Sequence, residues 1–186
     1  MNYYRNQKFT EAGQLTQNLI RKHPDWPAPQ ILNAKILFFT RKFREAENQL
    51  RETLDKNPNH PYARQWLARA IATQPERLTE AVAVLAQMLQ RNPDDSVAHY
   101  LLARCAERLG QREKAIRHYQ EAISVSATVS RAHLRLADLL NRNNLPERAR
   151  RHLEQVRALN LKSHAKEAKQ LLKHMDRQSE AGDDAG

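Results

Sequence analysis

The chain has 186 residues, of which 40% are hydrophobic and 28% are charged, and it contains only 4 glycines and 6% aromatic residues. This composition is typical of a soluble helical protein, and the aromatic residues are too few for a β sandwich. The formal net charge of +10 favours acidic partners, which are anionic peptides, nucleic acid or a membrane surface.

Three absences narrow the class of protein further. No run of about 18 apolar residues occurs, so we expect no membrane-spanning helix in this chain. Residues 1–13 lack the apolar core of a signal peptide, which makes the cytoplasm the default compartment. Cys105 is the single cysteine, which excludes an internal disulfide framework, and its place in an apolar stripe predicts a packed thiol.

Residues 1–26 predict an incomplete helix pair. Phe9, Ala12, Leu15 and Leu19 follow helical spacing and supply a full second helix, but the residues before them suffice for only the back half of a first helix. We therefore expect the native protein to continue upstream with more helix pairs or an anchor, which would make it membrane-anchored or periplasmic. The apolar faces left open at this end would favour self-association.

Residues 27–163 repeat one pattern with a period of 34 or 35 residues. Each unit holds an apolar stripe at helical spacing, a turn and a second stripe, which predicts an antiparallel helix pair. In one unit the first stripe ends at Gly110, and glycine after a periodic run is a helix stop signal. Three registers recur with this period: Ala12, Ala46, Ala81, Ala115 and Ala149; Ala34, Ala68, Ala103 and Ala137; and Pro24, Pro58 and Pro93.

These registers resemble those of the tetratricopeptide repeat (TPR) family, whose unit is a 34-residue helix–turn–helix. In that family a small residue in the first helix and an alanine in the second let the helices approach closely, and a proline tends to close the unit. The resemblance implies an all-α protein, a right-handed α-solenoid of antiparallel helix pairs. Four complete repeats are expected, at residues 27–60, 61–95, 96–129 and 130–163.

Two details depart from the family pattern. The large aromatic residue near the start of the first helix is replaced by Gln30, Arg64, His99 and His133. The 35-residue unit holds its extra residue within residues 72–80, where Pro75 prevents the first helix from continuing.

The C-terminal residues predict a cap and a tail. Residues 164–177 carry one apolar stripe opposite three lysines, and a polar-faced helix of this kind closes the end of a repeat array in water. Residues 178–186 are small, polar and acidic, which predicts a disordered tail.

Residues with catalytic or metal-binding potential form no recognisable motif. The sequence has no H-E-x-x-H, no C-x-x-C and no glycine-rich phosphate loop. Histidines at equivalent places in successive repeats would lie about 10 Å apart or more, which is too far for one ion. We therefore expect no enzymatic activity, no cofactor and no metal site.

The surface of the first helices carries the candidate binding residues. The resemblance implies that these helices line a concave face, and helical spacing groups the positions around the small alanine that point into it. The first two repeats place mainly aromatic residues there, and the last two place mainly arginines. The candidate ligand-binding residues are Lys35, Phe38, Phe39, Tyr62, Trp66, Arg69, Tyr100, Arg104, Arg108, Arg131, Arg135 and Arg142.

A groove of this composition predicts a non-enzymatic interaction module. Aromatic anchors supply affinity in peptide recognition, and arginine selects carboxylates, so a peptide or chain terminus with acidic groups would suit both ends. The module would act as an adaptor or assembly factor in a larger complex or a longer polypeptide. The alternative is a nucleic-acid-binding repeat protein, which the net charge and eight basic residues between 148 and 173 favour.

Overall fold

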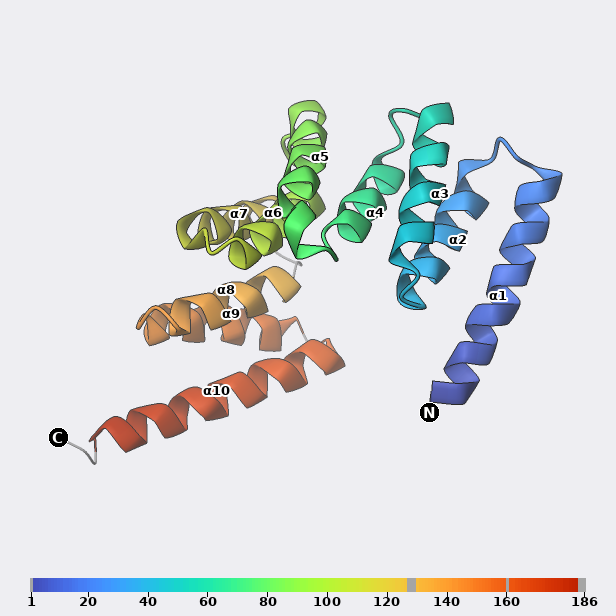
Figure 1. Ribbon diagram of the computed structural model, residues 1–186. Coiled ribbons are helices and arrows are strands. Elements are labelled where there is room, and N and C mark those ends of the chain that lie inside the picture. The colour runs from blue at the N-terminus through green and yellow to red at the C-terminus, as the bar shows by residue number, and fades with distance from the viewer. Residues whose placement is uncertain (1, 127–129, 160, 184–186) are drawn as a thin grey trace. The chain divides into compact units, whose positions relative to one another are not determined.

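The computed structural model describes residues 2–126, 130–159 and 161–183, which fold into helices joined by short turns (Figure 1). Within these ranges there is no strand, and the all-α prediction is confirmed. The chain divides into two compact units, unit 1 (Met1–Pro93) and unit 2 (Asp94–Gly186). The elements are α1 (Asn2–Lys22), α2 (Pro27–Phe39), α3 (Phe43–Lys56), α4 (Pro61–Ile71), the 3₁₀ turn η1 (Pro75–Arg77), α5 (Leu78–Arg91), α6 (Ser96–Arg108), α7 (Arg112–Val125), α8 (Ser130–Asn141), α9 (Pro146–Ala158) and α10 (Lys162–Asp183).

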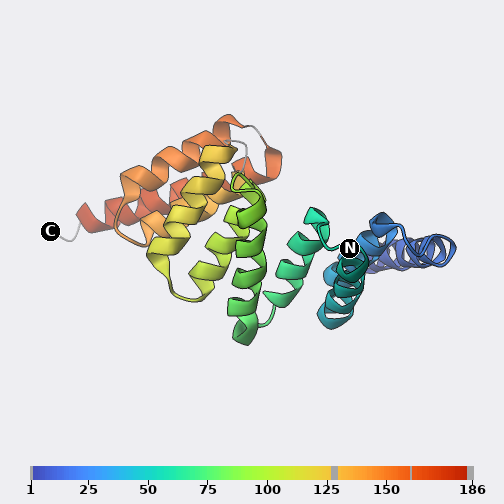
Figure 2. The same cartoon turned by 90° about the horizontal axis from the view of Figure 1, so that it is seen from above.

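Successive helices pack as pairs within each unit. In unit 1, α2 lies against α3 and α4 against α5, while α3 also contacts α4 and α1 covers α2. In unit 2, α6 packs on α7 and α8 on α9, and α10 covers both α9 and α8 (Figures 1 and 2). Each of the four pairs lies inside one of the four expected repeat ranges.

The alanine registers lie at buried positions on the paired helices. Because alanine has the smallest side chain after glycine, two helices that meet at alanines can pack closely. Ala12 is the exception in its register, since it is only half-buried on α1. The fully buried members, each 0–1% exposed, are Ala34, Ala46, Ala68, Ala81, Ala103, Ala115, Ala137 and Ala149.

Three of the turns inside the pairs end the first helix in the same way. Arg41, Gly110 and Asn144 lie at equivalent places and adopt left-handed backbone conformations, with φ of 66°, 71° and 57°. The next amide after each donates to a carbonyl five residues back, as in a Schellman motif; one example is Gln111 N to Ala106 O at 2.8 Å. The expected stop at Gly110 is therefore confirmed.

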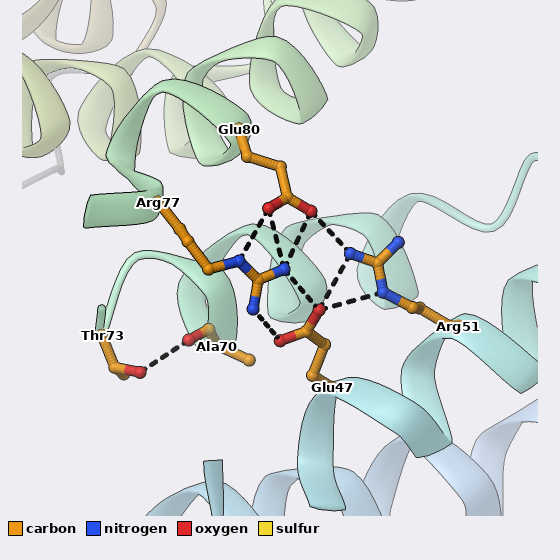
Figure 3. A network of polar contacts seen from close by, with 6 residues as sticks. All are labelled: Glu47, Arg51, Ala70, Thr73, Arg77 and Glu80. Atoms are coloured by element: carbon orange, nitrogen blue, oxygen red, sulfur yellow. Dashed lines mark hydrogen bonds and ion pairs between the residues drawn. The ribbon is translucent and has the colours of Figure 1, made fainter. Parts of the chain in front are cut away.

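The second pair turns differently, because η1 occupies the place of the left-handed residue. Pro75 opens this turn, and Arg77 at its end reaches back to Glu47 on α3 of the preceding repeat. The guanidinium binds both carboxylate oxygens of Glu47, at 2.7 and 2.8 Å. Arg51 and Glu80 complete the four-residue network shown in Figure 3, with Arg51 2.8 Å from Glu47 and 2.6 Å from Glu80.

The two ends of the chain differ from the sequence-based expectation. Residues 2–22 form one continuous helix, so the stub of a separate first helix is not found. Leu15 and Leu19, expected in the buried stripe of that segment, are 66% and 42% exposed. Among the described residues, α2 is the one helix on which α1 packs extensively. At the other end α10 continues to Asp183, so residues 178–183 of the expected tail are helical, and 184–186 lie outside the described residues.

Across the described ranges, no helix has the length and apolar character needed to cross a membrane.

We expect a larger side chain to be tolerated in place of a half-buried alanine but not in place of a fully buried one. Ala46→Leu should lower the free energy of unfolding by about 1–3 kcal/mol, because the extra atoms must displace α2. Ala12→Leu is the matched control in the same register and should change it by less than about 0.5 kcal/mol. Urea denaturation monitored by circular dichroism measures both, and equal losses would contradict the close crossing of α2 and α3.

The Glu47 network makes stability depend on pH. Hydrogen bonding from Arg77 lowers the pKa of Glu47 below its ordinary 4.5, against the opposing effect of burial. The stabilisation is therefore complete above pH 4.5 and is lost as the pH falls through the lower folded-state value. Glu47→Gln should cost about 1–3 kcal/mol near pH 7, since it removes the more buried of the two carboxylates that Arg51 and Arg77 share.

Two further measurements of unfolding free energy test the role of the Glu47 charge: one at low pH and one on a variant of an exposed ion pair. The difference in unfolding free energy between the parent chain and Glu47→Gln should shrink as the pH is lowered from 7 to 3. Glu45→Gln breaks only an exposed pair with Lys42, at 3.5 Å, and should cost less than about 0.5 kcal/mol. A Glu47 effect that is constant with pH would show that its charge is not what stabilises.

Candidate functional site

An aromatic cluster joins the first helices of the two repeats in unit 1. Phe38 and Phe39 end α2, and their ring centroids lie 5.5 and 5.8 Å from that of Trp66 on α4. Phe43 packs edge-on against Phe38 at 5.3 Å, and Phe9 of α1 stacks on Phe39 at 6.3 Å. Phe38 and Trp66 are half-buried, whereas Phe39 is 52% exposed and forms the accessible part of the cluster.

Two cations lie against the Trp66 ring. The Lys35 Nζ is 5.4 Å from the ring centroid and the Arg69 Cζ is 4.9 Å from it, both within the range of cation–π attraction. Each cation directly follows a buried alanine of the first-helix register, Ala34 or Ala68, so the helix crossing fixes the direction of both side chains. We call Lys35, Phe38, Phe39, Trp66 and Arg69 the aromatic–cationic surface.

Tyr62, the other candidate in unit 1, lies apart from this surface. It stands in the first turn of α4, is 64% exposed and has its ring 6.2 Å from that of His60. Trp26, which is 55% exposed, is a further exposed aromatic residue and is not one of the sequence-based candidates. It stacks on His23 at 4.1 Å in the turn between α1 and α2.

The candidates in unit 2 divide into one buried residue and a set of exposed arginines. Tyr100 is only 8% exposed and packs on Tyr119 at 5.9 Å, so it offers little surface to a ligand. Arg142 pairs with Asp138 at 2.9 Å and keeps an exposed side chain. The other exposed candidates on α6 and α8 are Arg104, Arg108, Arg131 and Arg135.

Tyr119 explains why an acidic residue lies among these arginines. Its hydroxyl donates to the Glu107 carboxylate across the α6–α7 pair. Burial first, and then the hydrogen bond to Glu107, raise the pKa of Tyr119, so the phenol stays protonated and holds the carboxylate in place. Glu107 thus serves the packing of its own repeat.

Cysteine and histidine side chains are the remaining groups that could react or bind a metal. Cys105 is 3% exposed, and burial raises the pKa of its thiol, as expected for an inert cysteine. In the described ranges no three or more His, Cys, Asp or Glu side chains converge on a common point.

Two histidine pairs lie within single repeats, whereas the sequence pattern aligns histidines of successive repeats and does not predict them. His99 on α6 faces His118 on α7, with their Nδ1 atoms 3.2 Å apart, and His133 on α8 faces His152 on α9 at 3.1 Å. The two pairs share a spacing of 19 residues and recur after 34. A spacing of 19 residues between two histidines, one on each helix of a pair, is the sequence feature that would have predicted these contacts.

Comparison with known proteins places this architecture in context. One tetratricopeptide repeat sequence profile matches residues 31–96 and 100–161, and another matches residues 72–122. No curated protein sequence matches the chain.

Several solved structures share the fold at low sequence identity. The thermophilic TPR protein TTC0263 of Thermus thermophilus is 17% identical over 92% of this chain and 94% of its own, with a TM-score of 0.78. MamA of Desulfovibrio magneticus is 22% identical over 84% and 88%, with a TM-score of 0.67. Human IFIT1, solved as a dimer with m7Gppp-AAAA, is 20% identical over 76% of this chain and 34% of its own, with a TM-score of 0.68.

These likenesses agree with the stacked helix pairs and confirm the α-solenoid fold class. The first profile alone covers more than half of the sequence. The chain therefore belongs to the tetratricopeptide repeat family.

Proposed function

We propose that this protein is a non-enzymatic adaptor that binds a peptide at the aromatic–cationic surface of unit 1. Membership of a family of interaction modules supports the general role. The observation that carries the specific role is the pairing of Phe39 with Trp66. Phe39 is an exposed ring backed by other rings, and two cations lie against the neighbouring Trp66 ring. Exposed aromatic surface of this kind costs solubility and is typical of binding sites.

The chemistry of the surface selects the ligand. An apolar or aromatic side chain would pack on Phe39, because its ring is already held by Phe9 and Trp66 and loses little freedom on binding. A carboxylate beside that side chain would reach Lys35 and Arg69 and gain charge-assisted hydrogen bonds. The ligand is therefore a segment with an apolar residue next to an acidic group, such as a chain terminus.

Unit 2, taken by itself, also offers basic side chains to acidic partners. Arg104, Arg108, Arg131 and Arg135 are exposed and have flexible side chains that can pair with carboxylates. Contacts of this exposed kind add selectivity and association rate more than affinity. An adaptor or assembly role would follow from holding such a segment while the rest of its protein remains accessible.

A fluorescence titration tests the peptide site. In a Trp26→Phe chain, Trp66 is the only remaining tryptophan, so its emission reports on the aromatic–cationic surface alone. Ten-residue peptides that end in an aromatic residue and a free carboxylate should change this emission, and the same peptides with an amidated end should bind about tenfold or more weakly. No saturable change with any such peptide would contradict the proposal.

A pair of double variants separates local recognition from general charge. Lys35→Gln with Arg69→Gln should weaken binding by about tenfold to a hundredfold, because two charge-assisted contacts are removed. Lys22→Gln with Arg44→Gln removes the same charge at exposed positions outside the surface and should leave affinity within about threefold. Circular dichroism should show that both variants keep their helicity. Equal weakening by the two variants would indicate general charge attraction and not binding at this surface.

Nucleic acid is the second candidate ligand. The formal charge of +10 favours it, and a fold-related protein, IFIT1, was solved with m7Gppp-AAAA. Binding to phosphates releases counterions, so affinity for a labelled oligonucleotide would fall by about a thousandfold or more between 50 and 200 mM salt if six or more phosphates are contacted. Fluorescence anisotropy that detects no complex at 50 mM salt would exclude this candidate.

A further inference from the structure

The histidine pair of the third repeat brings two metal-ligating atoms together from different helices. His99 comes from the first turn of α6 and His118 from the middle of α7, and their ring centroids lie 5.4 Å apart. Their Nδ1 atoms approach to 3.2 Å, which in the absence of an ion is a hydrogen bond from the protonated nitrogen of one ring to the bare nitrogen of the other. Moving that proton to the distant Nε2 leaves two lone pairs at the same place.

The separation of the two nitrogens suits a transition-metal ion. Imidazole nitrogens bind Zn²⁺ at about 2.0–2.1 Å, so two nitrogens 3.2 Å apart subtend an angle of about 100° at the metal. That angle is close to tetrahedral, and imidazole is a ligand that suits zinc, copper and nickel. We propose that His99 and His118 form a binding site for a divalent transition-metal ion, which fastens α6 to α7.

Glu121 is the candidate third ligand. Glu121 follows His118 by one helical turn on α7, and its charge already acts on the His118 ring. A carboxylate three residues after a histidine lies on the same helix face, so a change of rotamer brings it to the ion. Lys114 and Arg117 also act on His118 and oppose cation binding, which makes the Glu121 charge the more important.

The fourth repeat contains an equivalent histidine pair that is less exposed and has no carboxylate in the place of Glu121. His133 and His152 hold the same geometry at 3.1 Å, but His133 is only 2% exposed, whereas His99 and His118 are half-buried and open to an ion from solvent. The residue in the place of Glu121 is Gln155, whose amide hydrogen-bonds to His152. The two repeats therefore supply a site and its control within one chain.

Calorimetric titration of the full chain with Zn²⁺ tests the proposal. The parent chain should bind with a saturable heat, and its melting temperature should rise with Zn²⁺, since the ion binds the folded pair and not the separated helices. His118→Ala should lose this binding by more than about tenfold, because even groups outside the ligand shell typically matter by 10–100-fold. His152→Ala should leave it unchanged.

Glu121→Gln provides a variant that keeps both rings and therefore the hydrogen bond between α6 and α7. It should weaken Zn²⁺ binding, while Gln155→Glu in the fourth repeat should leave the affinity at the first pair as it was. The absence of saturable binding in the parent chain would overturn the proposal. So would equal binding by the parent and His118→Ala, which would show that other histidines hold the ion.

Discussion

The close crossing of paired helices at buried alanines is the constraint on which the rest of the structure depends. Ala34 on α2 and Ala46 on α3 are both 0% exposed, and the two helices pack against each other. Once Ala34 faces α3, helical geometry turns Lys35, Phe38 and Phe39 toward a different side. The same condition at Ala68 directs Arg69 on α4, and thus one steric requirement, applied twice, assembles the aromatic–cationic surface.

The requirement for small residues between paired helices is visible in the sequence as periodic alanines, and for this reason the fold could be predicted from it. Periodic alanines and prolines define helix pairs because backbone proximity tolerates few residue types, and the all-α fold followed from them. The groove positions beside the alanines stay a prediction, which rests on helical spacing. Contacts among Phe38, Phe39 and Trp66 are long-range consequences of that spacing, and they agree with the grouping of these residues.

The burial and contacts of individual side chains could not be predicted from the repeat pattern, because they depend on which residues of other helices lie next to them. Tyr100 shares the groove register, yet its ring packs against Tyr119, because a large ring at that place has an apolar neighbour to cover it. The exposure of Leu15 and Leu19 depends on how many helices lie next to α1, which periodicity does not report. The histidine pairs required a comparison across the turn of one repeat, where spacing depends on the length of that turn.

The turn η1 also determines how the array absorbs an added residue. One residue inserted within a helix rotates everything after it by about 100° relative to its apolar face. Here the addition lies between α4 and α5, where backbone direction is already changing, and Ala81 on α5 remains 0% exposed. The turn therefore absorbs the added residue, and α5 still presents its apolar face to the core although its repeat is one residue longer.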